Sequence, residues 1–410
     1  MKKDTNKKIS ISTDKDAIKH FMTRGIEKIY PNDGFLKSRL ESGEQLSMYL
    51  GIDPTGPTLH LGHSIALKKM AEFQKMGHKA ILLIGDFTAQ IGDPDKENVR
   101  KQLTREEVLE NAKLYKEQAS LFLDFDGPNA AELKYNSTWS DPMTFADVLN
   151  LASKMTVQQM MERDMFRKRL VEKKPIYIHE FMYPLMQGYD AVAMNVDGEI
   201  GGNDQTFNML VGRTLMKDML GKEKFVLPVK LLTDTSGSKM GKTTSNMLSF
   251  LDTPQEKFGK IMSWSDGMII PGFELLTDVD LKEINNRLSS GENPRDIKME
   301  LASNVTQFYH GKDMAQKAQK AFVTQFQKQE IPENLPEVVI NEELGIVEIL
   351  KKTGLAKSNN EARRKITEGA VVLNGNKVKS ISLKMSGGKL KKGDTVVLKL
   401  GRKIIKIKFK

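Results

Sequence analysis

The sequence reads Pro54-Thr-Gly-Pro-Thr-Leu-His60-Leu-Gly62-His63 between an apolar strand pattern at residues 47–52 and an amphipathic helix pattern at 61–76. A second apolar run, at 79–85, follows the helix directly after Gly77. Strand, helix and strand in this order predict a parallel β-α-β unit with a right-handed crossover. The sequence therefore predicts an α/β fold whose first domain is a Rossmann-like parallel sheet.

The two histidines of this segment stand at the predicted N-terminus of the helix, where unpaired N–H groups favour phosphate. His60 and His63 are three residues apart, so they lie on one side of the first turn and both can donate to phosphoryl oxygens. Gly62 between them allows a ribose or purine to approach the backbone closely. Two other interpretations stay open: a pair of metal ligands, although no acidic or Cys third ligand stands nearby, and two capping histidines.

A second segment, Lys239-Met-Gly-Lys242-Thr243, lies in a run rich in Gly, Ser and Thr about 180 residues downstream. This composition predicts a surface loop rather than a core element. Two lysines three residues apart can neutralise the charge that develops on a pyrophosphate leaving group. A solvated lysine-rich loop is the ordinary alternative, but together with the histidine segment the pattern indicates activation of a substrate by ATP.

Composition limits the class of protein and its partners. A chain of 410 residues predicts two or three domains, and the absence of cysteine excludes disulfides and thiolate sites. No apolar run has the roughly 18–20 residues of a membrane-spanning helix, and the polar N-terminus is not that of a secretory signal, so we expect a cytoplasmic protein without a membrane partner. Residues 345–410 carry 18 Lys and Arg against 4 Asp and Glu, which favours polyanion binding over a merely soluble tail.

The histidine and lysine segments together resemble the motifs of a known protein family. The histidine segment resembles the HIGH motif of class I aminoacyl-tRNA synthetases, and the lysine segment resembles a variant of their KMSKS loop, with Gly241 in place of Ser and Thr243 at the end. Four further segments narrow the resemblance to the tyrosyl-tRNA synthetases: Tyr49-Leu-Gly-Ile-Asp-Pro-Thr, Ile91-Gly-Asp93-Pro, Tyr183-Pro-Leu-Met-Gln187-Gly-Tyr-Asp190 and Gly201-Gly-Asn-Asp204-Gln205. The resemblance covers nearly the whole chain in the right order.

The resemblance implies a role for each matching residue. The catalytic group would be His60, His63, Lys239 and Lys242, and the ATP-binding group would be Gly62, Gly202, Asp204 and Lys242. The tyrosine site would comprise Tyr49 and Asp190 at the phenol, Tyr183, Gln187 and Asp93 at the α-ammonium group, and Gln205 near the carbonyl. Tyr183 and Gln187 are also four residues apart, so they share a helix face, although an ordinary polar pair would do the same.

The basic tail resembles an S4 RNA-binding domain over Gly354-Leu-Ala-Lys-Ser358-Asn-Asn-Glu361-Ala-Arg363-Arg364-Lys365. Its three consecutive cations, Arg363, Arg364 and Lys365, would contact RNA phosphates. We expect a Rossmann-like catalytic domain at 1–245, an all-α anticodon-binding domain at 246–330, a linker at 331–344 and a small α+β S4-like domain at 345–410.

The implied activity is ligation of tyrosine to tRNA in two steps, with ATP and its Mg²⁺ as substrate, no permanently bound cofactor or metal, and a homodimeric enzyme. Three alternatives remain at this point: a tryptophanyl-type synthetase, a nucleotidyltransferase of the same superfamily that does not bind RNA, and a non-catalytic S4-type RNA-binding protein. Tyr49 together with Asp190 favours tyrosine as the substrate, and both histidines with both lysines favour catalysis.

Overall fold

The computed structural model describes residues 9–93, 103–233, 248–326, 335–340, 344–378, 380–385, 395–401 and 403–409. The chain forms two compact units, Met1–Lys320 and Ala321–Lys410. We describe each unit by itself.

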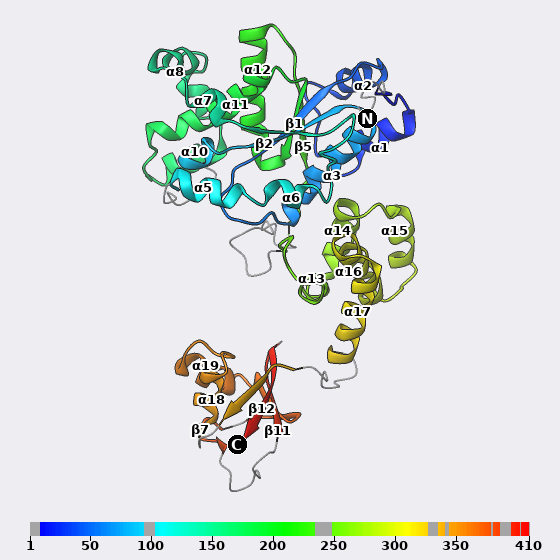
Figure 1. The fold of residues 1–410 in the computed structure, drawn as a ribbon, viewed down its shortest axis with the longest axis vertical. Helices are drawn as coiled ribbons and strands as arrows, with labels where there is room; N and C mark the ends of the chain where they lie inside the picture. Colours follow the sequence, from blue (N-terminus) through cyan, green and yellow to red (C-terminus); the bar gives the residue numbers. More distant parts are fainter. Residues whose placement is uncertain are drawn as a thin grey trace, which may run out of the picture. The chain divides into compact units, whose positions relative to one another are not determined.

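A five-stranded sheet in the order β3-β2-β1-β4-β5 is the centre of the first unit (Figure 1). Its strands are β1 (Ser47–Ile52), β2 (Lys79–Ile84), β3 (Glu132–Tyr135), β4 (Gly198–Gly202) and β5 (Phe225–Val229). All four neighbouring pairs are parallel, which confirms the predicted α/β class. The strand order reverses between β1 and β4, and the carboxyl ends of strands at such a switch point are where open α/β sheets bind ligands.

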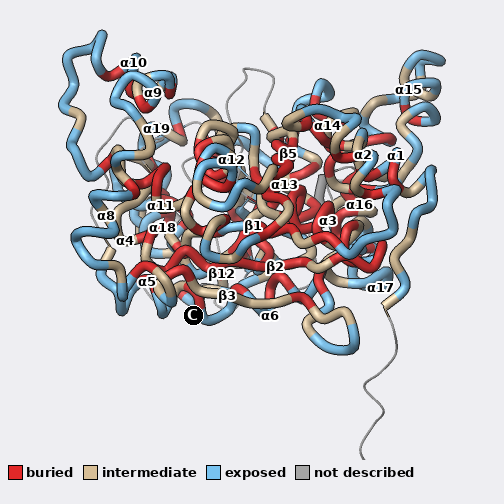
Figure 2. Tube along the Cα trace, turned by 90° about the horizontal axis from the view of Figure 1, so that it is seen from above, coloured by how far each residue is buried: buried red, intermediate tan, exposed pale blue. Residues whose placement is uncertain are grey.

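Helix α3 (Leu61–Lys75) connects β1 to β2, as the β-α-β pattern predicts. It buries Leu61, Ile65, Met70 and Phe73 against the sheet, and buried positions continue through β1 and β2 in Figure 2. The turn after this helix requires Gly77, because its φ is +91° and a Cβ would lie 2.3 Å from the Ser10 carbonyl oxygen.

Helices α11 (Ile178–Met194) and α12 (Thr206–Leu220) pack side by side (Figure 1). Two glycines allow this, since a Cβ on Gly188 would lie 3.0 Å from the backbone nitrogen of Gly212. The close approach brings the inner faces of the two helices together beside β4. Helix α12 directly follows a single 3₁₀ turn, η1 (Asn203–Gln205).

The stretch 141–170, which has a helical pattern in the sequence, is divided into short helices. These are α8 (Phe145–Ala152), α9 (Val157–Met160) and α10 (Asp164–Val171). The division has a local cause: Thr144 and Thr156 are N-caps whose hydroxyl groups accept hydrogen bonds from the backbone three residues ahead, and each capping box starts a new helix.

The other helices of this unit include those in the all-α domain predicted at 246–330. They are α1 (Lys15–Thr23), α2 (Asp33–Glu41), α4 (Thr88–Ile91), α5 (Arg105–Ala112), α6 (Tyr115–Ala119), α7 (Ser137–Ser140), α13 (Pro254–Met262), η2 (Asp266–Met268), α14 (Ile269–Leu276), α15 (Leu281–Ser289) and α16 (Pro294–His310). Helix α17 (Lys312–Phe326) contains the boundary between the two units. Arg24 joins the sheet region to the helices after 254. Its guanidinium donates to the carbonyl oxygens around the end of α14, which are those of Phe273, Glu274, Thr277 and Val279. The sheet region and the helices that follow it are therefore parts of one compact unit, and a division between 245 and 246 stays a prediction.

The second unit packs two helices on a mixed sheet in the order β6-β12-β11-β8-β9. Its elements are β6 (Glu337–Ile340), β7 (Leu344–Gly345), α18 (Ile346–Lys352), α19 (Asn359–Thr367), β8 (Val371–Leu373), β9 (Asn376–Lys377), β10 (Lys384–Met385), β11 (Thr395–Leu400) and β12 (Lys403–Phe409). Asn374 and Gly375 both have positive φ and form the turn between β8 and β9, whereas Gly393 and Asp394 lie outside the described residues.

The prediction of a linker over 331–344 is wrong for part of that range. Strand β6 pairs in parallel with β12, and Ile340 is buried in the same core as Ile407. The C-terminal unit therefore includes residues before 345, because the pairing of β6 depends on a strand more than 60 residues later in the chain.

Candidate active site

The histidine segment forms the N-terminal turn of α3. His60 is the N-cap, and its ring stacks on that of His63 with the centroids 3.9 Å apart. The Nδ1 atom of His60 accepts from the Gly62 N–H at 3.2 Å, and that of His63 accepts from the His60 N–H at 3.1 Å. Because each neutral ring uses Nδ1 as an acceptor, its hydrogen must be on Nε2. Capping and donation to phosphate are thus compatible roles.

Gly62 has a steric reason to be glycine. A Cβ at this position would lie 3.0 Å from two atoms of the His60 ring. The small residue therefore allows the two imidazoles to stack across the first turn of α3, in addition to the predicted close approach of the ligand.

The lysine segment lies outside the described residues, so Lys239 and Lys242 stay sequence predictions. The residues that follow it attach to the histidine segment. The Leu61 N–H donates to the Leu248 carbonyl at 2.9 Å, and the Phe250 N–H donates to the Leu59 carbonyl at 3.0 Å. The chain thus returns from the lysine segment directly beside the first turn of α3.

Two predicted phenol-binding residues lie beneath the switch point of the sheet. Tyr49 on β1 is fully buried, and Asp190 on α11 is 3% exposed. Burial raises the pKa of the Tyr49 hydroxyl, and the nearby carboxylates of Glu199 and Asp190 raise it further. The structure therefore brings together the two residues that the sequence places 141 positions apart.

Asp190 has two hydrogen-bond donors that the sequence did not indicate. The Trp139 indole N–H donates to one carboxylate oxygen at 2.8 Å, and the Asn136 amide donates to the other at 3.3 Å. Burial raises the pKa of the Asp190 carboxyl well above its usual value, while these two hydrogen bonds act in the opposite direction. Trp139 and Asn136 therefore fix the orientation of this carboxyl.

At the predicted ammonium-binding end, Tyr183 donates from its hydroxyl to Asp53 Oδ2 at 2.8 Å. Asp53 also accepts from the Thr88 hydroxyl at 2.7 Å. Burial, followed by the charges of Asp53 and Asp93, raises the pKa of Tyr183. Sequence reasoning assigned no role to Asp53, although this residue lies within the Tyr49–Thr55 motif that carried the resemblance.

The remaining predicted tyrosine residues each have a side-chain hydrogen-bond partner. Gln187 donates from Nε2 to Glu199 Oε1 at 3.2 Å, and Gln205 donates from Nε2 to Asp93 Oδ2 at 2.7 Å. Gln187, Gln205 and Asp93 are therefore all held by side-chain hydrogen bonds. Glu199, which sequence reasoning missed, is 2% exposed on β4.

The predicted ribose site lies at the end of β4. A Cβ on Gly202 would lie 2.4 Å from Asp204 Oδ1 and 3.0 Å from the side chain of Leu231. Glycine is therefore required for the Asp204 carboxylate to occupy its position in the 3₁₀ turn. The Asp204 carboxylate thus lies beside the Gly202 backbone, which has no side chain. This arrangement suits a ribose, because a carboxylate can accept from its two hydroxyl groups.

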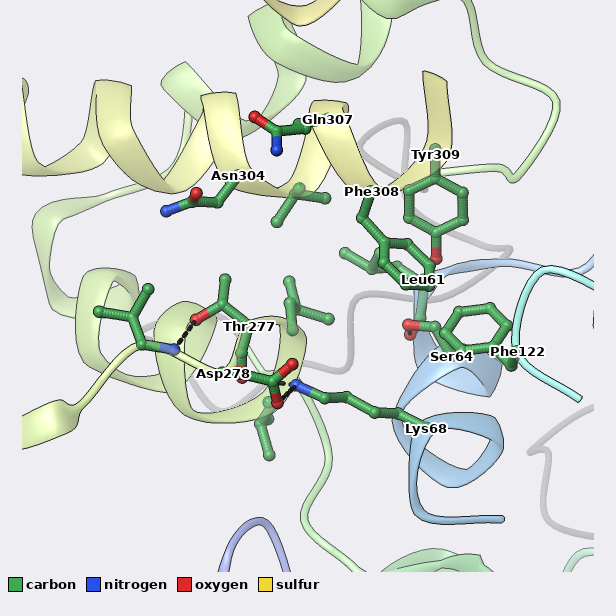
Figure 3. Close-up of a pocket in the computed structure, with 14 residues that line it drawn as sticks. Leu61, Ser64, Lys68, Phe122, Thr277, Asp278, Asn304, Gln307, Phe308 and Tyr309 are labelled. Carbon is green, nitrogen blue, oxygen red and sulfur yellow. Dashed lines mark hydrogen bonds and ion pairs between the residues drawn. The ribbon is translucent and has the colours of Figure 1, made fainter. Parts of the chain in front are cut away.

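A separate cavity of about 470 Å³ lies beside the first two turns of α3 (Figure 3). Lys68 crosses it, with its ammonium group 2.8 Å from the Asp278 carboxylate and 2.5 Å from the Thr277 carbonyl. The rest of its wall includes Phe122, Phe308 and Tyr309, and none of the predicted tyrosine or ATP residues lines it. We therefore do not regard it as the substrate site.

The predicted RNA-binding residues lie on α19. Arg363 and Arg364 are exposed and Lys365 is half-buried. Lys365 and Arg364 contact Glu368 at 2.7 and 3.6 Å, so part of their charge is neutralised locally. Among the described residues, no group of three or more His, Asp or Glu could hold a metal ion, and none of the described helices is long and apolar enough to span a membrane.

Comparison with known proteins adds two family matches. Residues 41–327 match the family described as tRNA synthetases class I (W and Y), and residues 327–406 match the C-terminal domain described as Tyrosine--tRNA ligase SYY-like. A tyrosine–tRNA ligase of Thermotoga maritima is 47% identical over 352 residues, which cover 84% of this chain and 87% of the relative. One of Carboxydothermus hydrogenoformans is 44% identical over 402 residues, which cover 94% and 96%.

Solved structures agree with the fold. A C-terminally truncated mitochondrial tyrosyl-tRNA synthetase of Aspergillus nidulans has a TM-score of 0.62 at 21% identity and covers 76% of this chain and 94% of its own. A tyrosyl-tRNA synthetase of Archaeoglobus fulgidus, solved in complex with L-tyrosine, has a TM-score of 0.59 at 23% identity and covers 74% and 98%. At these identities the similarity shows a shared architecture.

Proposed function

The chain belongs to the class I tRNA synthetases and, within them, to the tyrosine–tRNA ligases, and we propose that the side chains beneath the β1–β4 switch point form its tyrosine site. In the first step a carboxylate oxygen of tyrosine attacks the α-phosphorus of ATP. A new P–O bond forms, the bond to the β,γ-phosphates breaks, and pyrophosphate leaves. In the second step a hydroxyl of the 3′-terminal adenosine of tRNA attacks the tyrosyl carbonyl carbon, and AMP leaves.

The observation that carries the assignment of the site is the buried pair of Tyr49 and Asp190. A phenol that reaches this pair can hydrogen-bond to both side chains. Phenylalanine would add no hydrogen bond to this pair: the Tyr49 hydroxyl would keep only its 3.5 Å contact with the Gln187 carbonyl, and Asp190 only its contacts with Trp139 and Asn136. Buried polar groups whose hydrogen-bonding capacity is only partly used are costly. The pair therefore supports selection of tyrosine by its hydroxyl group.

At the other end of the substrate, we assign the α-ammonium group to Tyr183, Gln187 and Asp93, and the carbonyl region to Gln205. An ammonium group needs acceptors, and this end of the site offers a carboxylate, an amide oxygen and a phenol oxygen. The fixed partners of Gln187 and Gln205 support the assignment, because prepositioned groups lose little entropy when the substrate binds.

For the nucleotide, we assign the ribose to Asp204 beside Gly202 and the phosphates to His60 and His63. Protonated Nε2 atoms at a helix N-terminus suit the developing negative charge on the phosphates. Lys239 and Lys242 would stabilise the departing pyrophosphate. ATP enters with Mg²⁺ as a substrate-borne ion, so the account needs no resident metal.

For tRNA, we assign affinity to the basic C-terminal unit through Arg363, Arg364 and Lys365, and the anticodon region to the helices between 254 and 326. The high positive charge of residues 345–410 supports this division. Because its tRNA substrate is used in translation, we place the enzyme in the cytoplasm.

A second copy of the chain is the partner that we propose for the large apolar side chains exposed on consecutive helices α8 to α11. A contiguous exposed apolar patch on a soluble protein marks an interaction site. The helices α8, α9 and α10 carry exposed positions in Figure 2. The exposed side chains are Phe145, Leu149, Val157, Leu170, Val171 and Ile178.

Exchange of labelled pyrophosphate into ATP tests the proposed function, with tyrosine, tryptophan and phenylalanine supplied in parallel. We expect exchange that depends on tyrosine and not on the other two amino acids. Exchange that is fastest with tryptophan would identify the pocket as a tryptophan site. No exchange by a folded sample with Mg²⁺ would contradict the proposed catalytic site and favour a non-catalytic RNA-binding protein.

A further inference from the structure

A single buried amide connects two of the residues that we assign to tyrosine binding. Asn208 lies on α12 and is fully buried. Its Nδ2 donates to Gln187 Oε1 at 3.0 Å and to Gln205 Oε1 at 2.9 Å. Because Gln187 is on α11, the close packing of the two helices at Gly188 and Gly212 is what makes this double contact possible.

Carboxylates determine which way the two glutamine amides point. Gln187 turns its NH₂ group to Glu199, and Gln205 turns its NH₂ group to Asp93. A carboxylate can only accept hydrogen bonds, so the carbonyl oxygen of each glutamine must face the other way, towards Asn208. The side chain at position 208 must then donate to both glutamine carbonyl oxygens, and an amide NH₂ group has the two hydrogens that this requires.

Buried cations hold these carboxylates in turn. The Lys224 ammonium group is fully buried against Glu199. At the opposite end, Arg163 contacts Asp93 at 2.5 Å, with the two side chains 6% and 12% exposed. In each pair the cation contacts one carboxylate oxygen, and the glutamine NH₂ group donates to the other. The carboxylates at the two ends of this network therefore fix the direction of each hydrogen bond, and Asn208 links the Gln187 side of the network to the Gln205 side.

We propose that Asn208 is a positioning residue for tyrosine binding, which orients the Gln187 and Gln205 carbonyl oxygens through its two N–H groups. This inference rests on the proposed roles of the two glutamines. Each carbonyl oxygen keeps a second lone pair after it accepts from Asn208, and in that orientation it can accept from the substrate. The Asn208 Oδ1 atom is buried and has no hydrogen-bond partner among the described residues, so the NH₂ group alone explains the choice of an amide here.

The variant that tests the inference is Asn208→Leu, which has a similar shape and no donor. Removal of both donors should raise the KM for tyrosine roughly tenfold or more in the pyrophosphate-exchange assay, while the KM for ATP changes less than about twofold. A residue that only stabilises the packing of α11 on α12 would change the melting temperature without this split between substrates. Thr214→Val, on the exposed side of α12, is the matched control and should change neither constant.

Asn208→Asp adds a readout that a packing role would not give. When ionised, the introduced carboxylate faces two carbonyl oxygens without a donor, but the protonated acid recovers one O–H donor. The KM of this variant for tyrosine should therefore fall as the pH is lowered from 8.5 to 6, relative to wild type, whereas Asn208→Leu should show no such recovery. If Asn208→Leu does not fold, Asn208→Ser replaces it, because one hydroxyl hydrogen can serve only one glutamine.

Two results would overturn the proposal for Asn208: an unchanged KM for tyrosine in the folded Asn208→Leu protein, or equal increases in the constants for tyrosine and ATP. These results differ from failure of the proposed function, in which the wild-type protein itself would show no tyrosine-dependent exchange.

Discussion

Replacement of Asp190 by Asn isolates the acceptor at the phenol end of the site. The two side chains have the same shape, but only the carboxylate can accept on both oxygens. In the structure both oxygens are in use, one by Trp139 at 2.8 Å and the other by Asn136 at 3.3 Å. An amide at this position would turn its NH₂ group towards one of these two donors, so the pocket would lose its double acceptor.

The size of the effect follows from the ionised form of this acceptor, which the hydrogen bonds from Trp139 and Asn136 favour against the effect of burial. A hydrogen bond to a charged group contributes about 1.5–3 kcal/mol, which corresponds to roughly ten- to a hundredfold in kcat/KM. Tyrosine loses this contribution in Asp190→Asn, and phenylalanine, which has no hydroxyl, has none to lose. The ratio of kcat/KM for tyrosine over phenylalanine should therefore fall by roughly ten- to a hundredfold.

Pyrophosphate exchange with each amino acid measures this ratio. Asp218→Asn is the matched control, because it makes the same chemical change at an exposed side chain that pairs with Lys154 on the surface. Such surface pairs contribute little, so the control should keep the wild-type ratio. If Asp190→Asn leaves the ratio of kcat/KM for tyrosine over phenylalanine unchanged, or lowers kcat/KM equally for both amino acids, the reasoning is refuted. The substrate phenol would then bind to other residues.

Four further predictions concern other parts of the chain. Lys242→Ala should slow adenylate formation far more than it weakens tyrosine binding, measured by rapid quench and equilibrium titration; equal losses would indicate a role in the ground state. Removal of residues 331–410, a boundary that keeps β6 with its own sheet, should preserve exchange and raise the KM for tRNA, and loss of exchange would make the tail part of the catalytic fold. Burial lowers the pKa of His78 from 6.5 to about 4, so the unfolded chain binds an additional proton between these values. The free energy of unfolding should then fall by up to about 3 kcal/mol as the pH drops from 6.5 to 4, less so in His78→Asn, and equal urea-unfolding profiles of the two proteins would contradict this. Phe145→Glu combined with Ile178→Glu should yield monomers in analytical ultracentrifugation, and an unchanged dimer would place the interface elsewhere.

Local patterns predicted much of the first unit. The β-α-β segment from 47 to 85 and the helices after 254 follow from periodicity, because their apolar residues repeat at the spacing of the element. Strands β3 and β6 were not predicted. Each has four residues, which is too short for a clear alternation, and β6 becomes a strand only by pairing with β12 far along the chain.

The residues that contact the predicted site residues were harder to infer than the site residues themselves. Sequence motifs identified Tyr49, Asp190 and Gln187. The roles of Glu199, Lys224 and Asn208 depend instead on contacts with side chains that are distant in sequence. A lysine is expected on the surface, so a fully buried Lys224 has no signal of its own in the sequence. Asp53 is different, because it lies within a quoted motif and a closer reading of that motif could have found it.

A crystal structure of the enzyme with tyrosine bound tests the assigned site most directly. The account predicts the phenol oxygen within about 2.5–3.0 Å of the Tyr49 hydroxyl and the Asp190 carboxylate. It also predicts the α-ammonium group facing Tyr183, Gln187 and Asp93. A tyrosine bound with its phenol away from Asp190, or with its ammonium group held by other residues, would contradict the account.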